Sequence, residues 1–171
     1  FKAGSGYKGS FEVLKTYLSR DYLWNSIRQI GGAYGCFIQF SSITGNLAMV
    51  SYRDPQVSKT YEAYDRLPHV VSDMELSPQA LEQLIIGTYG NFDPHQSAAA
   101  KGVTARNEYL CNITAEQKRQ RLQEITATTL DELRSYADQM RAMTDNRYRA
   151  IIGNRAKIEA DSALFDSIVE L

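Results

Sequence analysis

The sequence is poor in residues that bind metals, with only two histidines and two cysteines among 171 residues. A zinc site needs three or four ligands brought close together. His69 and His95 belong to no HxxEH or HxxxH pattern, and each follows a proline, which is typical of a surface position. Cys36 and Cys111 form no CxxC pair, so we expect two small buried residues and a reducing compartment. The sequence therefore predicts that this chain binds no metal.

The chain also lacks an excess of charge and a long hydrophobic run. Its formal net charge is −1, so neither nucleic acid nor an anionic membrane is an expected partner. No run of 18 apolar residues is present, and we expect no membrane span. No signal peptide is visible, and the chain starts at Phe1 rather than at methionine. We therefore expect a piece of a longer protein, from the cytoplasm or an organelle interior rather than a secreted one.

Motifs of self-sufficient catalysis are missing as well. The sequence contains neither a G-x-S-x-G nucleophile elbow nor a GxxxxGK[ST] phosphate loop. With 43% hydrophobic residues, a chain of this length is expected to form one domain, over residues 1–171, that buries roughly 70% of its unfolded surface. We expect an ordinary hydrophobic core without a catalytic centre of its own.

The first part of the chain predicts a helix followed by a hairpin. Apolar residues recur at helical spacing from Ser10 to Ile30, with Ser10 as the expected N-cap and Glu12 in the first turn. Gly31 and Gly32 are expected to end this helix through a left-handed cap. Two strand-like runs, 33–41 and 47–53, are separated by a turn at 44–46, which predicts an antiparallel hairpin.

The remaining residues predict mostly helices. A helix with Val57 and Tyr64 on its buried face is expected to kink or end at Pro68, and the next helix is expected to begin at Ser77-Pro78. The expected elements after it are a loop over 87–94, a helix over 98–111, helices opened by capping boxes at 114–117 and 129–132, a strand over 147–153 and a final amphipathic helix.

This order predicts an α+β fold with an antiparallel-rich mixed sheet covered by helices. Three strands are few for so many helices, which indicates an incomplete domain whose further strands come from a missing N-terminal part.

The stretch from Arg28 to Gly35 has both a structural and a functional interpretation. Structurally, an arginine in a last helical turn favours the helix dipole, glycines cap the helix, and Tyr34 starts a strand. Functionally, the same corner would place a guanidinium and a phenol near one another. Small residues would leave room for an outside backbone to approach; these are Gly31, Gly32, Ala33 and Gly35. Arg28 and Tyr34 would then donate to a peptide carbonyl or a developing oxyanion.

Several runs carry a family resemblance over nearly the whole chain. They are Tyr22 to Gly35, with its GGAYG, and Ser51-Tyr52-Arg53-Asp54-Pro55, together with 7–10, 85–88 and 93–94. The combination resembles the C-terminal domain of a presequence-protease-like member of the pitrilysin and insulin-degrading family of zinc metallopeptidases. Within the last run, we expect Tyr52 in the core and Arg53 paired with Asp54 at the strand-to-helix corner.

The resemblance implies a domain of the metallopeptidase fold from a large clamshell enzyme that degrades unfolded peptides in a closed chamber. Zinc and the catalytic glutamate lie in the N-terminal half, which is the expected partner within the same polypeptide. The last domain supplies an arginine and a tyrosine that align with Arg28 and Tyr34. The chain alone is expected to be inactive.

Two alternatives remain open from the sequence. One is a structural or binding homologue of the same fold that has lost catalysis, although retention of both Arg28 and Tyr34 speaks against it. The other is an unrelated interaction domain. An HxxEH motif in the parent's N-terminal sequence would distinguish the peptidase from the first alternative.

Overall fold

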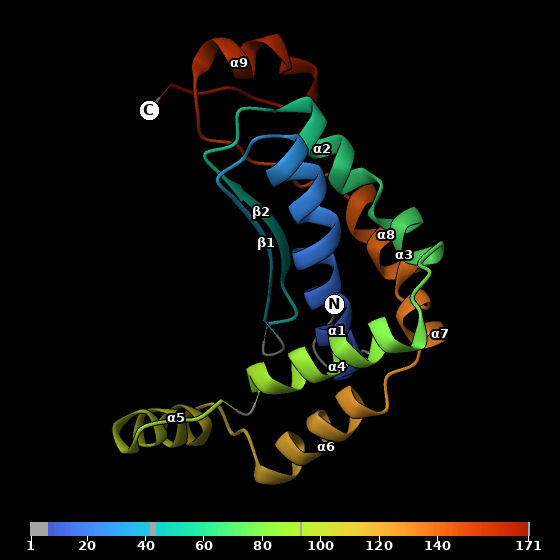
Figure 1. Cartoon of the computed structure of the whole chain (residues 1–171). Helices are drawn as coiled ribbons and strands as arrows, with labels where there is room; N and C mark the ends of the chain where they lie inside the picture. The colour runs from blue at the N-terminus through green and yellow to red at the C-terminus, as the bar shows by residue number, and fades with distance from the viewer. Residues whose placement is uncertain (1–6, 42–43, 93, 171) are drawn as a thin grey trace.

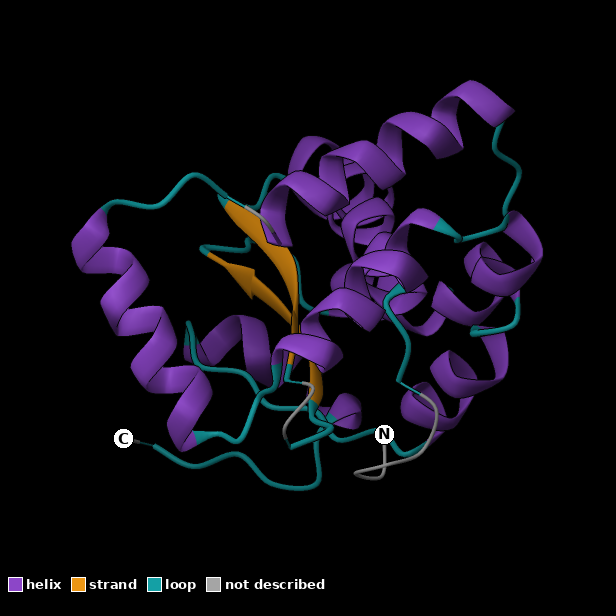
Figure 2. Cartoon of the chain, turned by 90° about the horizontal axis from the view of Figure 1, so that it is seen from below, coloured by secondary structure: helices purple, strands orange, loops and turns teal. Residues whose placement is uncertain are grey.

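The structure is a computed structural model that describes residues 7–41, 44–92 and 94–170. Helices dominate, and one hairpin lies beside the first helix (Figures 1 and 2). In chain order the elements are α1 (Ser10–Tyr17), η1 (Leu18–Tyr22), η2 (Trp24–Ile30), β1 (Gly35–Phe40), β2 (Leu47–Tyr52), α2 (Ser58–Asp65), α3 (Leu67–Ser72), α4 (Pro78–Phe92), α5 (Ala98–Leu110), α6 (Ala115–Thr126), α7 (Leu130–Arg134), α8 (Ala137–Asp145), α9 (Arg155–Ala160) and η3 (Ser162–Leu164). None of the described helices is long and apolar enough to cross a membrane.

The predicted helix over Ser10 to Ile30 is confirmed, but its second half is wider than an α-helix. After α1 the chain continues as the π-helical segments η1 and η2, whose hydrogen bonds span one residue more. The predicted N-cap is wrong by one residue. Gly9 holds that position, and the fully buried Ser10 hydroxyl instead lies 2.9 Å from the Tyr136 hydroxyl.

The core lies along one stripe of this first helix. Its largest fully buried side chains are Phe11, Leu14, Leu18, Leu23 and Ile27. They pack between the hairpin on one side and α3, α7 and α8 on the other, as the cluster of buried residues shows. The spacing read from the sequence therefore identified the buried face correctly.

The predicted hairpin is confirmed with shorter strands. β1 and β2 pair antiparallel, with Gly35 opposite Tyr52 and Phe40 opposite Leu47. Gly45 takes a positive φ of 73°, the conformation expected of glycine in the turn. Residues 42–43 of the connection lie outside the described residues. Cys36 and Ile38 of β1 are buried against the first helix, so the hairpin is fixed to the core by alternate residues of this strand.

Two predicted helix boundaries agree with the structure, whereas one predicted loop is wrong. α2 ends before Pro68, which sits in the first turn of α3, and the Ser77 hydroxyl accepts from the Ala80 N–H at 3.2 Å as α4 begins. The loop expected over 87–94 is helix up to Phe92. Packing explains this difference, because the buried Thr88 hydroxyl lies 3.0 Å from the Thr16 hydroxyl and holds this part of α4 against α1.

The later helices follow their predicted caps. Thr114 and Gln117 form the reciprocal capping box of α6, and the Thr129 hydroxyl accepts from the Glu132 N–H. The helix expected over 98–111 is α5, which has no buried residue and projects from the rest of the molecule (Figure 1). Asp93, which was expected in the loop before it, lies outside the described residues.

The strand predicted over 147–153 is wrong, because this segment makes no ladder with the hairpin. It is held instead by α2, where the Tyr61 hydroxyl donates to the Ala150 carbonyl oxygen at 3.0 Å and Arg149 pairs with Asp65 at 2.6 Å. An open groove of about 840 Å³ separates it from β2.

The final amphipathic helix is also shorter than predicted. It consists of α9 and the short turn η3, and residues 165–170 continue without helix. The described chain is thus of the mixed α+β kind, but its sheet has two strands rather than the larger sheet expected.

Candidate functional site

The turn that joins η2 to β1 forms the corner predicted at the end of the first helix. The Gly32 N–H donates to the Arg28 carbonyl oxygen and the Ala33 N–H to that of Ile27, each at 3.1 Å. Gly32 has a φ of +81°, a left-handed conformation that glycine adopts without strain. The chain therefore leaves the helix sharply and enters β1 beside the helix end, as the Gly-Gly pair predicted.

The glycines of this corner have different roles. A Cβ on Gly31 would lie 2.5 Å from the Ile27 carbonyl oxygen, so Gly31 is required by the helix end itself. The space that a Gly31 side chain would occupy is filled by its own helix, and the role predicted for Gly31 in admitting an outside backbone stays a prediction. A Cβ on Gly35 would meet no atom of the described residues within 4 Å, so the space beside it is open with respect to that part of the chain.

Arg28 is stacked on an aromatic ring of its own helix. Its guanidinium carbon lies 3.8 Å from the centroid of the Trp24 ring. Four residues are close to one full turn in a π-helix, which brings the two side chains onto the same face. Trp24 remains 38% exposed, so the stacked pair faces solvent. The ring supports the guanidinium, and such pairs contribute about 0.5–1 kcal/mol at exposed sites.

Tyr34 stands at the beginning of the hairpin with its ring in solvent. It is 66% exposed, although its N–H donates to the Tyr52 carbonyl oxygen at 3.1 Å. The Tyr34 and Tyr52 rings meet edge to face, with centroids 6.0 Å apart. The guanidinium carbon of Arg53 lies 5.9 Å from the Tyr34 centroid. The backbone is therefore fixed by the hairpin, and the phenol is held by its neighbours yet accessible.

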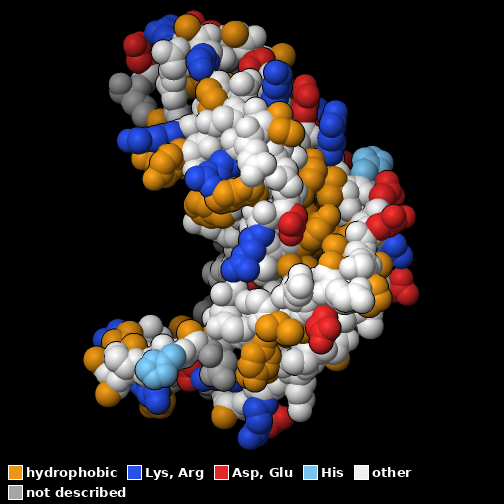
Figure 3. All heavy atoms as spheres, in the orientation of Figure 1, with side chains coloured by type: hydrophobic (Ala, Val, Ile, Leu, Met, Phe, Trp, Pro, Cys, Tyr) orange, Lys and Arg blue, Asp and Glu red, His pale blue; other side chains and the backbone are white. Residues whose placement is uncertain are grey.

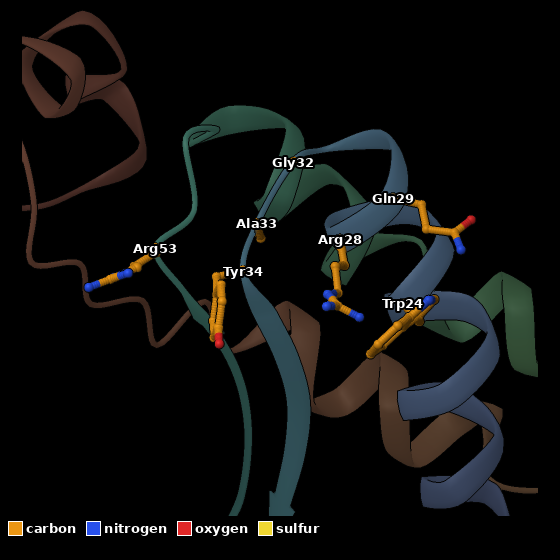
Figure 4. Close-up of a pocket in the computed structure, with 7 residues that line it drawn as sticks. All are labelled: Trp24, Arg28, Gln29, Gly32, Ala33, Tyr34 and Arg53. Atoms are coloured by element: carbon orange, nitrogen blue, oxygen red, sulfur yellow. The ribbon is translucent and has the colours of Figure 1, made fainter.

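These side chains line one open pocket of about 450 Å³ at the corner (Figure 4). Its lining residues are Trp24, Arg28, Gln29, Gly32, Ala33, Tyr34 and Arg53. In Figure 4 the Arg28 side chain lies in the space between Tyr34 and Trp24, while Gln29 points away. Figure 3 shows Lys and Arg side chains next to apolar ones on the hollowed face of the molecule.

The pocket contains four of the six residues predicted for the site and adds three others. Arg28, Gly32, Ala33 and Tyr34 line it, whereas Gly31 and Gly35 do not. Sequence reasoning missed its additional lining residues, which are Trp24, Gln29 and Arg53. Trp24 could have been found, because an aromatic residue four positions before an arginine on one helix is a recurring cation–π arrangement.

The strand-to-helix corner after β2 differs from its prediction. Tyr52 is 53% exposed rather than buried in the core. Arg53 does not pair with Asp54, whose carboxylate instead accepts from the Thr60 hydroxyl at 2.7 Å and from the Gln56 N–H at 2.9 Å. Asp54 therefore fixes the corner as expected, but by binding the start of α2 and not by binding arginine.

Neither Arg28 nor Arg53 takes part in an ion pair among the described residues, although pairs occur at many other surface positions. The Cys36 thiol is buried and close enough to Arg28 to be affected by its charge. Burial raises the pKa of Cys36, and the positive charge of Arg28 opposes this rise. A buried thiol with a raised pKa stays protonated at neutral pH, so Cys36 is a core residue rather than a nucleophile.

The other candidate ligands are dispersed. His69 and His95 are both exposed, and Cys111 is exposed as well, contrary to the expectation that it would be buried. Within the described ranges, no group of three or more His, Cys, Asp and Glu side chains is arranged to hold a metal ion. The chemistry available at the corner pocket is therefore hydrogen-bond donation and positive charge.

The family model described as the PreP C-terminal domain matches residues 1–155. Protein HypA of Clostridium perfringens is 36% identical over 96% of this chain and 17% of its own length. Presequence protease 1, chloroplastic/mitochondrial, of Arabidopsis thaliana is 30% identical over 94% of this chain and 15% of its own length. The mitochondrial presequence protease of Schizosaccharomyces pombe is 22% identical over 91% of this chain. The chain thus spans less than a fifth of the length of these relatives.

Proposed function

The chain belongs to the family of PreP C-terminal domains, and from this membership we propose that it is the C-terminal domain of a zinc metalloendopeptidase that degrades unfolded peptides. The names of its relatives in Arabidopsis thaliana and Schizosaccharomyces pombe support a peptidase as the parent protein. In this proposal the zinc ion is held by residues outside this chain, in the N-terminal half of the same polypeptide. That half and the peptide substrate are the two partners of the domain.

Within the parent, the corner pocket contributes Arg28 and Tyr34 to substrate binding. The observation that carries this proposal is that both residues line one open pocket, with the Tyr34 phenol exposed and the Arg28 guanidinium without an ion pair among described residues. Both groups are donors that retain hydrogen-bonding capacity for a ligand. They would bind a substrate carbonyl and stabilise the negative charge that develops on it during hydrolysis.

The geometry supports the interpretation that both donor groups are in position before substrate arrives. Trp24 supports the Arg28 guanidinium, and the hairpin fixes the backbone of Tyr34. The small residues Gly32 and Ala33 line the pocket and leave it accessible to an extended peptide backbone. Preorganised donors are effective because they need no rearrangement when charge develops in the transition state.

The proposal is tested by Tyr34→Phe and Arg28→Ala in the full-length parent. Loss of one such donor is expected to lower kcat for an unfolded peptide about 10²–10³-fold, while bound zinc, measured by metal analysis, stays constant. Tyr148→Phe is the matched control, because Tyr148 is exposed and lies outside the pocket. Unchanged turnover in both variants would contradict the role assigned to the pocket.

A second measurement separates the peptidase from a homologue that has lost catalysis. The full-length parent is expected to cleave unfolded peptides in a zinc-dependent manner, whereas the 171-residue chain alone is expected to be inactive. A parent without zinc-dependent cleavage would favour the structural homologue. Zinc-dependent cleavage by the purified chain would contradict the proposal that the zinc site lies outside this chain.

A further inference from the structure

The Tyr34 ring lies between two arginine side chains. In Figure 4 Arg28 is on one side of Tyr34 and Arg53 on the other, and both line the corner pocket. Besides its distance of 5.9 Å from the Tyr34 centroid, the Arg53 guanidinium carbon lies 5.5 Å from the centroid of Tyr52. Both distances are close to the upper limit of about 6 Å for attraction of a cation to the negative face of an aromatic ring, so the guanidinium is held loosely at the rim of the pocket.

Among the described residues, neither arginine at this rim forms an ion pair. The neighbouring Asp54 carboxylate accepts hydrogen bonds from Thr60 of α2 and from the Gln56 N–H, which do not cancel its negative charge, but the two arginines outnumber it. A further cation is close to the same turn, because Lys157 Nζ donates to the Pro55 carbonyl oxygen at 3.1 Å. A concave surface with unpaired positive charge attracts anionic groups and raises their local concentration.

The backbone at Arg53 is also unusual. Its φ of 49° is in the left-handed region, which costs about 1–2 kcal/mol for a residue with a Cβ. A glycine would take this conformation without strain. At this position the Arg53 guanidinium lies within 6 Å of the centroids of both tyrosine rings. Backbone strain of this kind is found at ligand sites, where the surrounding structure maintains it.

We propose that Arg53 makes the corner pocket a carboxylate-binding subsite for peptides, and that it sets a preference for an acidic group next to the residue bound by Arg28 and Tyr34. This inference rests on the proposed function and names the chemistry of the favoured substrate. A guanidinium offers a planar fork of donors that matches a carboxylate in two parallel hydrogen bonds. The carboxylate comes from an aspartate or glutamate side chain of the peptide, or from its C-terminus.

The sole tryptophan of the chain gives a direct binding signal, because Trp24 lines this pocket and is stacked on Arg28. Three alanine-rich peptides of equal length serve as probes for titration of the 171-residue chain. The first has a central glutamate and an amidated C-terminus, the second replaces this glutamate by glutamine, and the third is the glutamine peptide with a free C-terminal carboxylate. Binding is followed by Trp24 emission and by anisotropy of a dye on the peptide N-terminus.

The glutamate peptide or the free-carboxylate peptide is expected to bind about tenfold more tightly than the amidated glutamine peptide. Tighter binding of the glutamate peptide would identify a side-chain carboxylate as the ligand, and tighter binding of the free-carboxylate peptide would identify the C-terminus. Raising the salt concentration is expected to reduce this preference, because the site is open to solvent. Equal affinity of all three peptides would overturn the proposal.

Variants then assign the preference to Arg53. Arg53→Gly removes the guanidinium and suits the left-handed backbone, so the fold is expected to persist while the preference is lost. Arg53→Lys is expected to retain part of the preference through its charge. Arg141→Gln is the matched control, since Arg141 pairs with Asp138 on α8 and lies outside the pocket. A preference that survives Arg53→Gly would contradict the inference.

The binding assay does not involve cleavage, so the two proposals fail separately. If Tyr34→Phe leaves turnover of the parent unchanged but Arg53→Gly abolishes the preference for carboxylates, the subsite stands and the catalytic role fails. If turnover depends on Tyr34 and the three peptides bind equally, the catalytic role stands and the subsite fails.

Discussion

The guanidinium carbon of Arg28 lies 3.8 Å above the ring of Trp24, four residues earlier on the same π-helical segment. Because both residues lie on this segment, the helix itself determines where the ring supports the Arg28 guanidinium. The side chain reaches the corner pocket in a defined orientation, although it has no ion pair among the described residues. Trp24 therefore lines the pocket and also positions Arg28 within it.

Removing the ring should weaken the function of Arg28 without abolishing it. In the full-length parent, Trp24→Ala is expected to lower peptide turnover about two- to fivefold, the equivalent of 0.5–1 kcal/mol for an exposed cation–π pair. Trp24→Phe is expected to be intermediate, because a phenylalanine ring binds cations less well. Steady-state kinetics measure the effect. A loss as large as that of Arg28→Ala would show that Trp24 contacts substrate itself.

The two glycines that flank the corner should respond in opposite ways to a methyl group. Gly31→Ala is expected to destabilise the chain by about 1–3 kcal/mol, because the new Cβ would lie 2.5 Å from the Ile27 carbonyl oxygen. The new methyl group of Gly35→Ala would meet no atom of a described residue within 4 Å, and Gly35 does not have a positive φ, so this change is expected to be neutral or to stabilise by up to about 1 kcal/mol. Urea unfolding of both variants checks this, and equal effects would contradict the assigned difference.

Alkaline pH should destabilise the chain through its buried tyrosines. Burial raises the pKa of Tyr64 to about 12, and the nearby Ser51 hydroxyl opposes this rise. A tyrosine in the unfolded chain loses its proton near pH 10. Above this pH the unfolded state is therefore deprotonated while Tyr64 in the folded state still holds its proton. The free energy of unfolding is therefore at its full value below pH 10 and falls as the pH rises toward 12.

The measurement is urea unfolding at several pH values between 8 and 12. Burial also raises the pKa of Tyr7 and Tyr136, which contribute in the same direction. Tyr64→Phe removes one of these groups, and the loss of stability per pH unit above 10 is expected to become smaller. An unchanged slope would show that the Tyr64 phenol is not buried in the folded state.

The helix-to-strand corner could be predicted from the sequence because its determinants are local. The apolar spacing from Phe11 to Ile27 fixed the buried face, and the Gly31-Gly32 pair marked the turn. The two strands follow from β-branched and aromatic residues around a glycine turn. These features act between residues that are near one another in the chain.

The predictions that were wrong concern contacts between distant segments. α4 continues past Gly87 because Thr88 packs on Thr16, 72 residues earlier, and neither local sequence indicates this. The segment over 147–153 has the composition of a strand, but α2 holds it away from β2. Arg53 was predicted to pair with its sequence neighbour Asp54, whereas in the structure the Asp54 carboxylate accepts a hydrogen bond from Thr60. In each case the structure depends on contacts that the local sequence does not reveal.

The alternation of buried and exposed side chains along β1 has a consequence for the pocket. Tyr34 precedes a strand whose Cys36 and Ile38 are buried in the core, and a two-stranded sheet has little stability of its own. The pocket and the core are therefore expected to melt as one cooperative unit. Heating should abolish ligand binding and helical structure over the same temperature range, and no state should survive in which the donors are ordered but the core is not.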